Sequence, residues 1–182
     1  MSILGGGSGE EAENPEQEIE MKESEVIEEL QDLQKNMEKM LEAESSLVKG
    51  LENGIPKERI KDRVGSIEIF LEEDIQPEEE NLENKIHKLE KREARLKKQG
   101  QLREGHQKLL ETIEDAISKV RGERERLRDV VNKAGKLTSN EDFSHEKVLG
   151  KLEDELQTEE REARVLEEEI SEIKSEEAQI QS

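Results

Sequence analysis

The stretch LGKLEDELQTEEREARVLEEEISEI, residues 149–173, has the most regular repeat in this 182-residue chain. Its apolar residues recur in alternating steps of three and four, the spacing of a single buried stripe along an α-helix. The row consists of Leu149, Leu152, Leu156, Ala163, Leu166, Ile170, Ile173 and Ile180. Glu159 and Glu177 take two positions where the row would place an apolar residue. The pattern predicts a long amphipathic helix over residues 141–181.

A second row of the same spacing lies near the N-terminus. It consists of Ile19, Val26, Leu30, Leu33, Met37, Met40, Leu47 and Leu51. Glu23 and Glu44 interrupt it. The row predicts a helix over residues 17–52 that ends at Asn53 and Gly54, since glycine readily takes the left-handed conformation that closes a helix. Residues 1–16 hold glycine and glutamate with little apolar surface, so we expect a disordered acidic tail there.

Two further helices are predicted in the middle of the chain. A short row predicts a helix over residues 57–75, and Pro77 is expected to separate it from the next. This short row consists of Ile60, Val64, Ile67 and Leu71. A third helix is predicted over residues 78–136 from two successive heptad frames. The first frame consists of Leu82, Ile86, Leu89 and Leu96, and the second of Ile113, Ala116, Val120, Leu127, Val130, Ala134 and Leu137.

The register of the two frames slips between Leu96 and Leu109, in a segment that also holds Gly100 and Gly105. Because this segment contains no proline, the first interpretation is a continuous helix with a hinge or a local change of supercoil. A loop that makes a hairpin is the alternative interpretation. The sequence does not decide between them.

The last two predicted helices are expected to form an antiparallel hairpin. The helical stretch 144–181 would be on the order of 55 Å long, and the stretch from about 101 to 136 that precedes it is nearly as long. A short link between rods of equal length favours antiparallel packing. Four arginines near the turn are expected to face mainly acids of the last helix. They are Arg121, Arg124, Arg126 and Arg128, opposite Lys147, Glu153, Asp154 and Glu155.

Charge is unevenly distributed along the chain, in three successive blocks. Residues 1–84 carry 25 acidic and 8 basic side chains, residues 85–136 carry 9 and 16, and residues 137–182 carry 15 and 5. A basic helix that packs between acidic helices is the simplest interpretation. The predicted fold is therefore all-α, an elongated antiparallel coiled coil or bundle of about four helices. Its expected parts are the tail 1–16, an acidic helical pair 17–75, and a hairpin 78–181 of a basic and an acidic helix.

Composition excludes several classes of protein. Charged residues make up 43% of the chain, and the aromatic residues are two phenylalanines, which is too little bulk for an ordinary globular core. The chain has no cysteine, so disulfides and thiolate chemistry are excluded. No apolar run approaches the roughly 18 residues of a membrane span, and we expect a cytoplasmic location. A high-salt cytoplasm would also favour so acidic a composition.

No residue pattern indicates catalysis, and the sequence predicts a non-enzyme without catalytic, cofactor-binding or metal-ligating residues. The histidines His87, His106 and His145 lie far apart in the sequence and lack the spacing of a metal motif. We expect them on a solvated helix surface. The runs Glu78–Glu80 and Glu167–Glu169 are expected to form solvated acidic faces, because consecutive helical residues point in different directions.

The predicted function is a cytoplasmic, non-catalytic scaffold, spacer or adaptor that binds itself or another helical protein and has no small-molecule ligand. Its expected interaction seam consists of Leu30, Leu33, Met37, Met40, Leu47, Ile113, Val120, Leu127, Leu149, Leu152, Leu156, Leu166, Ile170 and Ile173. A basic face for a partner is expected at Lys88, Arg92, Arg95, Lys97, Lys98 and Arg103. The first alternative is a subunit that assembles on an anionic membrane surface. The second is nucleic-acid binding by residues 85–108, which the missing aromatic side chains and the net charge of −20 disfavour.

Overall fold

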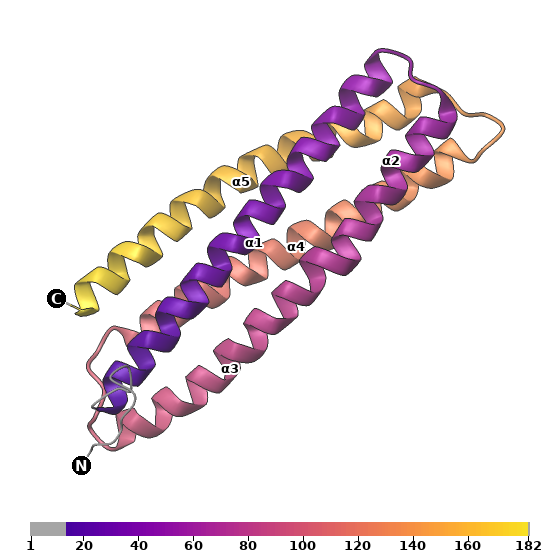
Figure 1. Ribbon diagram of the computed structural model, residues 1–182. Helices are drawn as coiled ribbons and strands as arrows, with labels where there is room; N and C mark the ends of the chain where they lie inside the picture. Colours follow the sequence, from indigo (N-terminus) through magenta and orange to yellow (C-terminus); the bar gives the residue numbers. More distant parts are fainter. Residues whose placement is uncertain (1–13, 182) are drawn as a thin grey trace, which may run out of the picture.

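The computed structural model describes residues 14–181, which fold as an all-α bundle of four long helical segments (Figure 1). The second segment consists of two α-helices joined by a single π-helical turn, η2. In chain order the elements are α1 (Pro15–Glu52), α2 (Lys57–Phe70), η2 (Leu71–Ile75), α3 (Gln76–Lys98), α4 (His106–Thr138) and α5 (His145–Gln181). The all-α fold class predicted from the sequence is confirmed.

Consecutive segments run antiparallel, and the last returns beside the first (Figure 1). The α1 helix packs against α5 on one side and against α2 and α3 on the other. On the opposite side of the bundle, α4 packs against α5 and against α2 and α3. The apolar row of each helix therefore faces the inside of one closed bundle.

The buried apolar side chains form one continuous core along the bundle. Most residues of the predicted seam are buried in it, while Leu149 and Leu156 are half-buried and pack against its edge. Aliphatic side chains dominate this core, and burying each one stabilises the fold by roughly 1.5 to 3 kcal/mol. The predicted seam is thus used within the chain itself.

The expected helix boundary at Pro77 is wrong. The backbone continues from α2 through η2 into α3 without a loop, and Pro77 lies in the first turn of α3. A proline removes one backbone donor, and a π turn just before it changes the local hydrogen-bonding pattern. The chain absorbs the proline in this way, and residues 57–98 form one long rod. The predicted division between residues 17–75 and 78–181 therefore falls inside a continuous helical segment.

The expected continuous helix over residues 78–136 is also wrong, and the alternative interpretation of a hairpin loop holds. α3 ends at Lys98 and α4 begins at His106. Gly100 has φ +68° and Gly105 has φ +105°, conformations that side chains other than glycine rarely adopt. The register slip in the sequence therefore marks the loop between two antiparallel helices.

The helix ends match their local sequence signals. The side chain of Asn14 accepts a hydrogen bond from the Gln17 backbone at the start of α1, so α1 begins inside the tail predicted for residues 1–16. Residues 1–13, where the rest of that tail and its glycines lie, are outside the described residues. Gly54 has φ +70° after α1, and Ser144 accepts from the Lys147 backbone at the start of α5.

Opposite charges join neighbouring helices along the bundle. Arg126 of α4 pairs with Glu155 and Glu162 of α5, as the predicted hairpin requires. The other three arginines expected to face α5 turn instead toward the second segment: Arg121 and Arg124 to Glu79, and Arg128 to Glu72. The cationic half of α3 pairs with acids of α1, for example Lys85 with Glu29.

Candidate functional site

Three polar side chains lie in the core near the loop that joins α3 and α4. Glu23 comes from α1, Glu93 from α3 and His106 from the first turn of α4, and their exposed fractions are 1%, 1% and 0%. Ionisable side chains are rarely buried so fully without a partner. We call Glu23, Glu93 and His106 the inner cluster.

The apolar rows place these three residues in the core. Glu93 continues the first heptad frame between Leu89 and Leu96, and Glu23 interrupts the α1 row. His106 lies one heptad before Ile113, at the position where the second frame would begin. Helix periodicity therefore directs all three polar side chains inward at the same end of the bundle.

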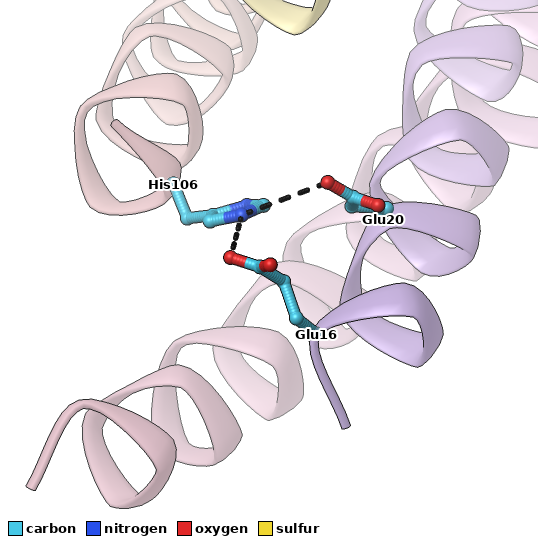
Figure 2. Close-up of side chains that lie close together, drawn as sticks. All are labelled: Glu16, Glu20 and His106. Atoms are coloured by element: carbon cyan, nitrogen blue, oxygen red, sulfur yellow. Dashed lines mark hydrogen bonds and ion pairs between the residues drawn. The ribbon is translucent and has the colours of Figure 1, made fainter. Parts of the chain in front are cut away.

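His106 holds carboxylates on both of its ring nitrogens. Its Nδ1 lies 3.0 Å from Oε1 and 3.0 Å from Oε2 of Glu23. Its Nε2 lies 3.2 Å from Oε2 of Glu16 and 4.0 Å from Oε2 of Glu20. Figure 2 shows both carboxylates pointing toward the imidazole ring. Burial alone would lower the pKa of His106, but the hydrogen bonds and negative charges of Glu23 and Glu16 outweigh it, and the pKa is raised.

Arg103 pairs with Glu16 and Glu20, which we call the outer pair of acids. Its Nε lies 3.1 Å from Glu16 Oε1, and a terminal guanidinium nitrogen lies 3.0 Å from Glu20. The backbone N–H of Arg103 also donates to Glu16 at 2.8 Å. Burial raises the pKa of Glu16, but the hydrogen bonds and the positive charge of Arg103 lower it by a larger amount. The pKa of Glu16 is therefore below its ordinary value. The loop between α3 and α4 thus supplies a cation to the outer pair of acids.

Glu93 has no such cation. Burial, a hydrogen bond with Glu23 and the negative charge of Glu23 raise the pKa of Glu93 to about 9. Its Oε2 is buried and has no hydrogen-bond partner. The inner cluster therefore combines a paired imidazole, a paired carboxylate and a carboxyl group with one unused oxygen.

A basic groove opens on the adjacent surface, between α1 and α3. Its volume is about 400 Å³. Five cations surround an apolar floor made by Val26 and Leu89. The lining consists of Lys22, Glu25, Val26, Lys85, Lys88, Leu89, Arg92 and Arg95. Within residues 14–181, Lys22, Lys88 and Arg95 have no carboxylate partner, whereas Lys85 and Arg92 pair with Glu29 and Glu18.

The predicted basic face is divided by the structure. Lys88, Arg92 and Arg95 line the basic groove. Lys97 donates to Gln107 of α4, and Arg103 pairs with Glu16 and Glu20 at the bundle end. Lys98 is exposed and lies outside the groove. The groove is completed by Lys85, the first residue of the basic segment 85–108, and by Lys22, which the sequence did not single out.

The expectation that all three histidines are solvated is wrong for His106, which is fully buried. His145 is half-buried, and its Nε2 lies 2.7 Å from the Ile55 carbonyl oxygen, whereas His87 is exposed. The expected solvated glutamate faces are interrupted in the same way. Glu79 is buried against Arg124, and Glu169 is buried beside Lys119.

The inner cluster was missed because its members are 13 to 83 residues apart in the sequence and no local motif joins them. A signal did exist, since each residue occupies a core position of an apolar row. To predict the cluster, one would have to know that these core positions of three different helices lie at the same height in the bundle. Their relative heights depend on the loop at residues 99–105, which the sequence does not define. Comparison with protein-family models, curated proteins and solved structures gives no match.

Among residues 14–181, no helix combines the length and the apolar character needed to cross a membrane.

Proposed function

We propose that this chain is a non-catalytic adaptor, a rigid helical bundle that binds an acidic helical segment of another protein in the basic groove. The observation that carries the proposal is the groove itself, with five cations on a chain of net charge −20. Exposed cations on so acidic a chain would find carboxylates of the same molecule easily. Three cations around one depression have no carboxylate partner among residues 14–181, and this favours an anionic partner.

The spacing of the basic side chains supports a helical partner. Lys85, Lys88, Arg92 and Arg95 follow one another at intervals of three and four along one face of α3. This row extends over about 15 Å, or nearly three helical turns. Glutamates at the same intervals on a partner helix would match it, and the floor of Val26 and Leu89 would receive an apolar side chain between them.

The closed core supports an adaptor rather than a coiled coil assembled from several chains. The apolar rows are buried inside one bundle, so partner binding would use the outer surface. The bundle also provides a stiff support, because each side of the groove belongs to a helix longer than five turns. A cytoplasmic location stays a prediction of the sequence.

The test is binding of a fluorescent acidic helical peptide with glutamates at intervals of three and four. We expect binding to weaken with salt, since the contacts are between exposed charges. The double variant Lys88→Glu with Arg95→Glu should bind about tenfold more weakly. The matched control, Lys61→Glu with Lys98→Glu, changes net charge equally outside the groove and should bind as the wild type does.

Two results would overturn the proposal. One is equal weakening in the groove variant and the control, because binding would then follow net charge alone. The other is groove-dependent binding of anionic vesicles or duplex DNA without binding of the peptide. The adaptor would then give way to a membrane-surface or nucleic-acid function.

A further inference from the structure

We propose that Glu23, Glu93 and His106 form a binding site for one divalent transition-metal ion such as Zn²⁺. The three side chains come from three helices, and each offers a ligand atom within 4.8 Å of the others. This inference concerns the inner cluster and does not depend on the adaptor proposal, whose groove uses other side chains.

The donor set suits such an ion. Imidazole nitrogen and carboxylate oxygen are the usual ligands of Zn²⁺ at sites with three protein ligands. A tetrahedral ion with bonds of about 2.1 Å holds its ligand atoms about 3.4 Å apart. The 3.0 Å between His106 Nδ1 and Glu23 is close to this spacing, so modest side-chain rotations would be enough. Mg²⁺ prefers six oxygen ligands and keeps much of its water, which suits this buried site poorly.

A second observation points to a ligand. Oε2 of Glu93 is buried and has no hydrogen-bond partner, although the side chain is only 1% exposed. Buried carboxyl oxygens normally accept a hydrogen bond, because leaving one unpaired costs free energy. A cation held between Glu93, Glu23 and His106 would satisfy this oxygen.

The surroundings of the imidazole support the same assignment. A histidine that binds metal through one nitrogen usually donates its other N–H to a carboxylate, which fixes the ring. Here Nε2 of His106 lies 3.2 Å from Glu16, and Arg103 in turn holds Glu16. Nδ1 is the nitrogen that faces Glu23 of the inner cluster. The outer pair of acids, Glu16 and Glu20, already has the cation of Arg103, so we assign the metal to the inner cluster.

The site is built on a stiff framework. Glu23 and Glu93 lie within long helices, and His106 follows Gly105, whose φ of +105° lets the backbone enter α4 sharply. A Cβ atom at position 105 would lie 3.0 Å from Ile180 Cγ1 at the end of α5. All four long segments therefore meet around this end of the bundle, which holds the three ligands in a fixed relation.

The test is calorimetric titration of the full chain with Zn²⁺, with Mg²⁺ as a comparison. We expect one Zn²⁺ per chain and much weaker binding of Mg²⁺. Glu93→Gln should reduce Zn²⁺ affinity by about tenfold or more. Glutamine keeps the shape of the side chain and can still donate to Glu23, so this variant should fold, which circular dichroism would verify. The visible absorption of bound Co²⁺ should change in Glu93→Gln and vanish in His106→Gln.

Glu44→Gln is the matched control, because Glu44 is also a buried glutamate with unpaired oxygens but belongs to no cluster of potential metal ligands among residues 14–181. Its Zn²⁺ affinity should equal that of the wild type. The proposal fails if the wild type binds no Zn²⁺, or if Glu93→Gln and Glu44→Gln bind it equally well. It also fails if Glu20→Gln abolishes binding while Glu93→Gln does not, since the ion would then belong to the outer acids.

Discussion

The interface between α3 and α4 and the interface between α1 and α5 both bury glutamates, but they differ in what faces the carboxylates. Glu79 of α3 is 1% exposed and receives two hydrogen bonds from Arg124 of α4, at 2.8 and 3.1 Å. Glu44 of α1 is 0% exposed, and neither of its oxygens has a hydrogen-bond partner.

The missing partner changes the pKa of Glu44. Burial, together with the negative charges of Glu155 and Glu160 on α5, raises the pKa of Glu44 to about 8. A third interface, between α4 and α5, shows the same effect: burial, a hydrogen bond with Glu162 and the negative charge of Glu162 raise the pKa of Glu123 to about 8. One interface is thus held by an ion pair, while the other accepts glutamate by keeping it neutral. The same residue type serves either purpose, depending on the helix opposite.

The largest effect is expected from Arg124→Met. Methionine fills similar space but leaves the buried Glu79 carboxylate with only the more distant Arg121. Breaking a buried pair in this way should lower the free energy of unfolding by about 3 to 5 kcal/mol, measured by urea denaturation. Arg128→Met removes the exposed pair with Glu72 and should change it by less than about 1 kcal/mol. Equal losses in both variants would show that burial does not distinguish the two pairs.

Truncation of the α5 row tests the apolar side of the α1/α5 interface. Leu152 is 0% exposed, and Leu152→Ala should cost about 2 to 5 kcal/mol of unfolding free energy through the cavity it leaves. Val165 lies on the same helix and is 42% exposed, so Val165→Ala should cost much less. Unchanged thermal unfolding of Leu152→Ala would contradict the packing described for α5.

A smaller effect is expected from Glu44→Gln and depends on pH. The folded pKa of Glu44 lies above the ordinary value of 4.5, so the folded state holds a proton that the unfolded chain releases. Stability of the wild type should therefore fall as pH rises from about 4.5 to 8. Glutamine removes this contribution and should stabilise the fold at pH 8 by a few kcal/mol, since one pKa unit corresponds to about 1.4 kcal/mol.

Unfolding free energies at pH 5 and pH 8 check the prediction. The two proteins should be similar at pH 5 and diverge toward pH 8. Residual pH dependence in the variant is expected from Glu93 and Glu123, whose pKa values are also raised. Parallel curves would mean that Glu44 is charged in the fold.

The long-range part of the site was harder to predict than the helices. The rows of α1 and α5 follow from apolar spacing alone, because burial of a stripe is a local requirement of an amphipathic helix. The continuity across Pro77 was missed because a π turn has no distinct sequence pattern. The break after Lys98 was left open because two glycines without a proline are compatible with both a hinge and a loop.

The acidic exceptions in the rows were visible, but their partners were not. A lysine or arginine opposite Glu44, Glu159 or Glu177 would pair with the buried carboxylate. The structure instead leaves Glu44 unpaired and gives Glu177 a hydrogen bond from Ser24 at 2.6 Å, and Glu159 has one buried oxygen without a partner. The apolar row of a helix predicts which residues face inward. Which residues they contact depends on how far one helix is shifted along its neighbour, and the loops determine this shift.

The central claim is that the apolar rows of this chain close within a single molecule. Light scattering coupled to size-exclusion chromatography measures the mass in solution directly. We expect the mass of one chain, 20.9 kDa, with the large hydrodynamic radius of an elongated bundle. A stable dimer that dissociates only when Leu152 or Leu166 is replaced by alanine would contradict it, because the rows would then pack against a second copy.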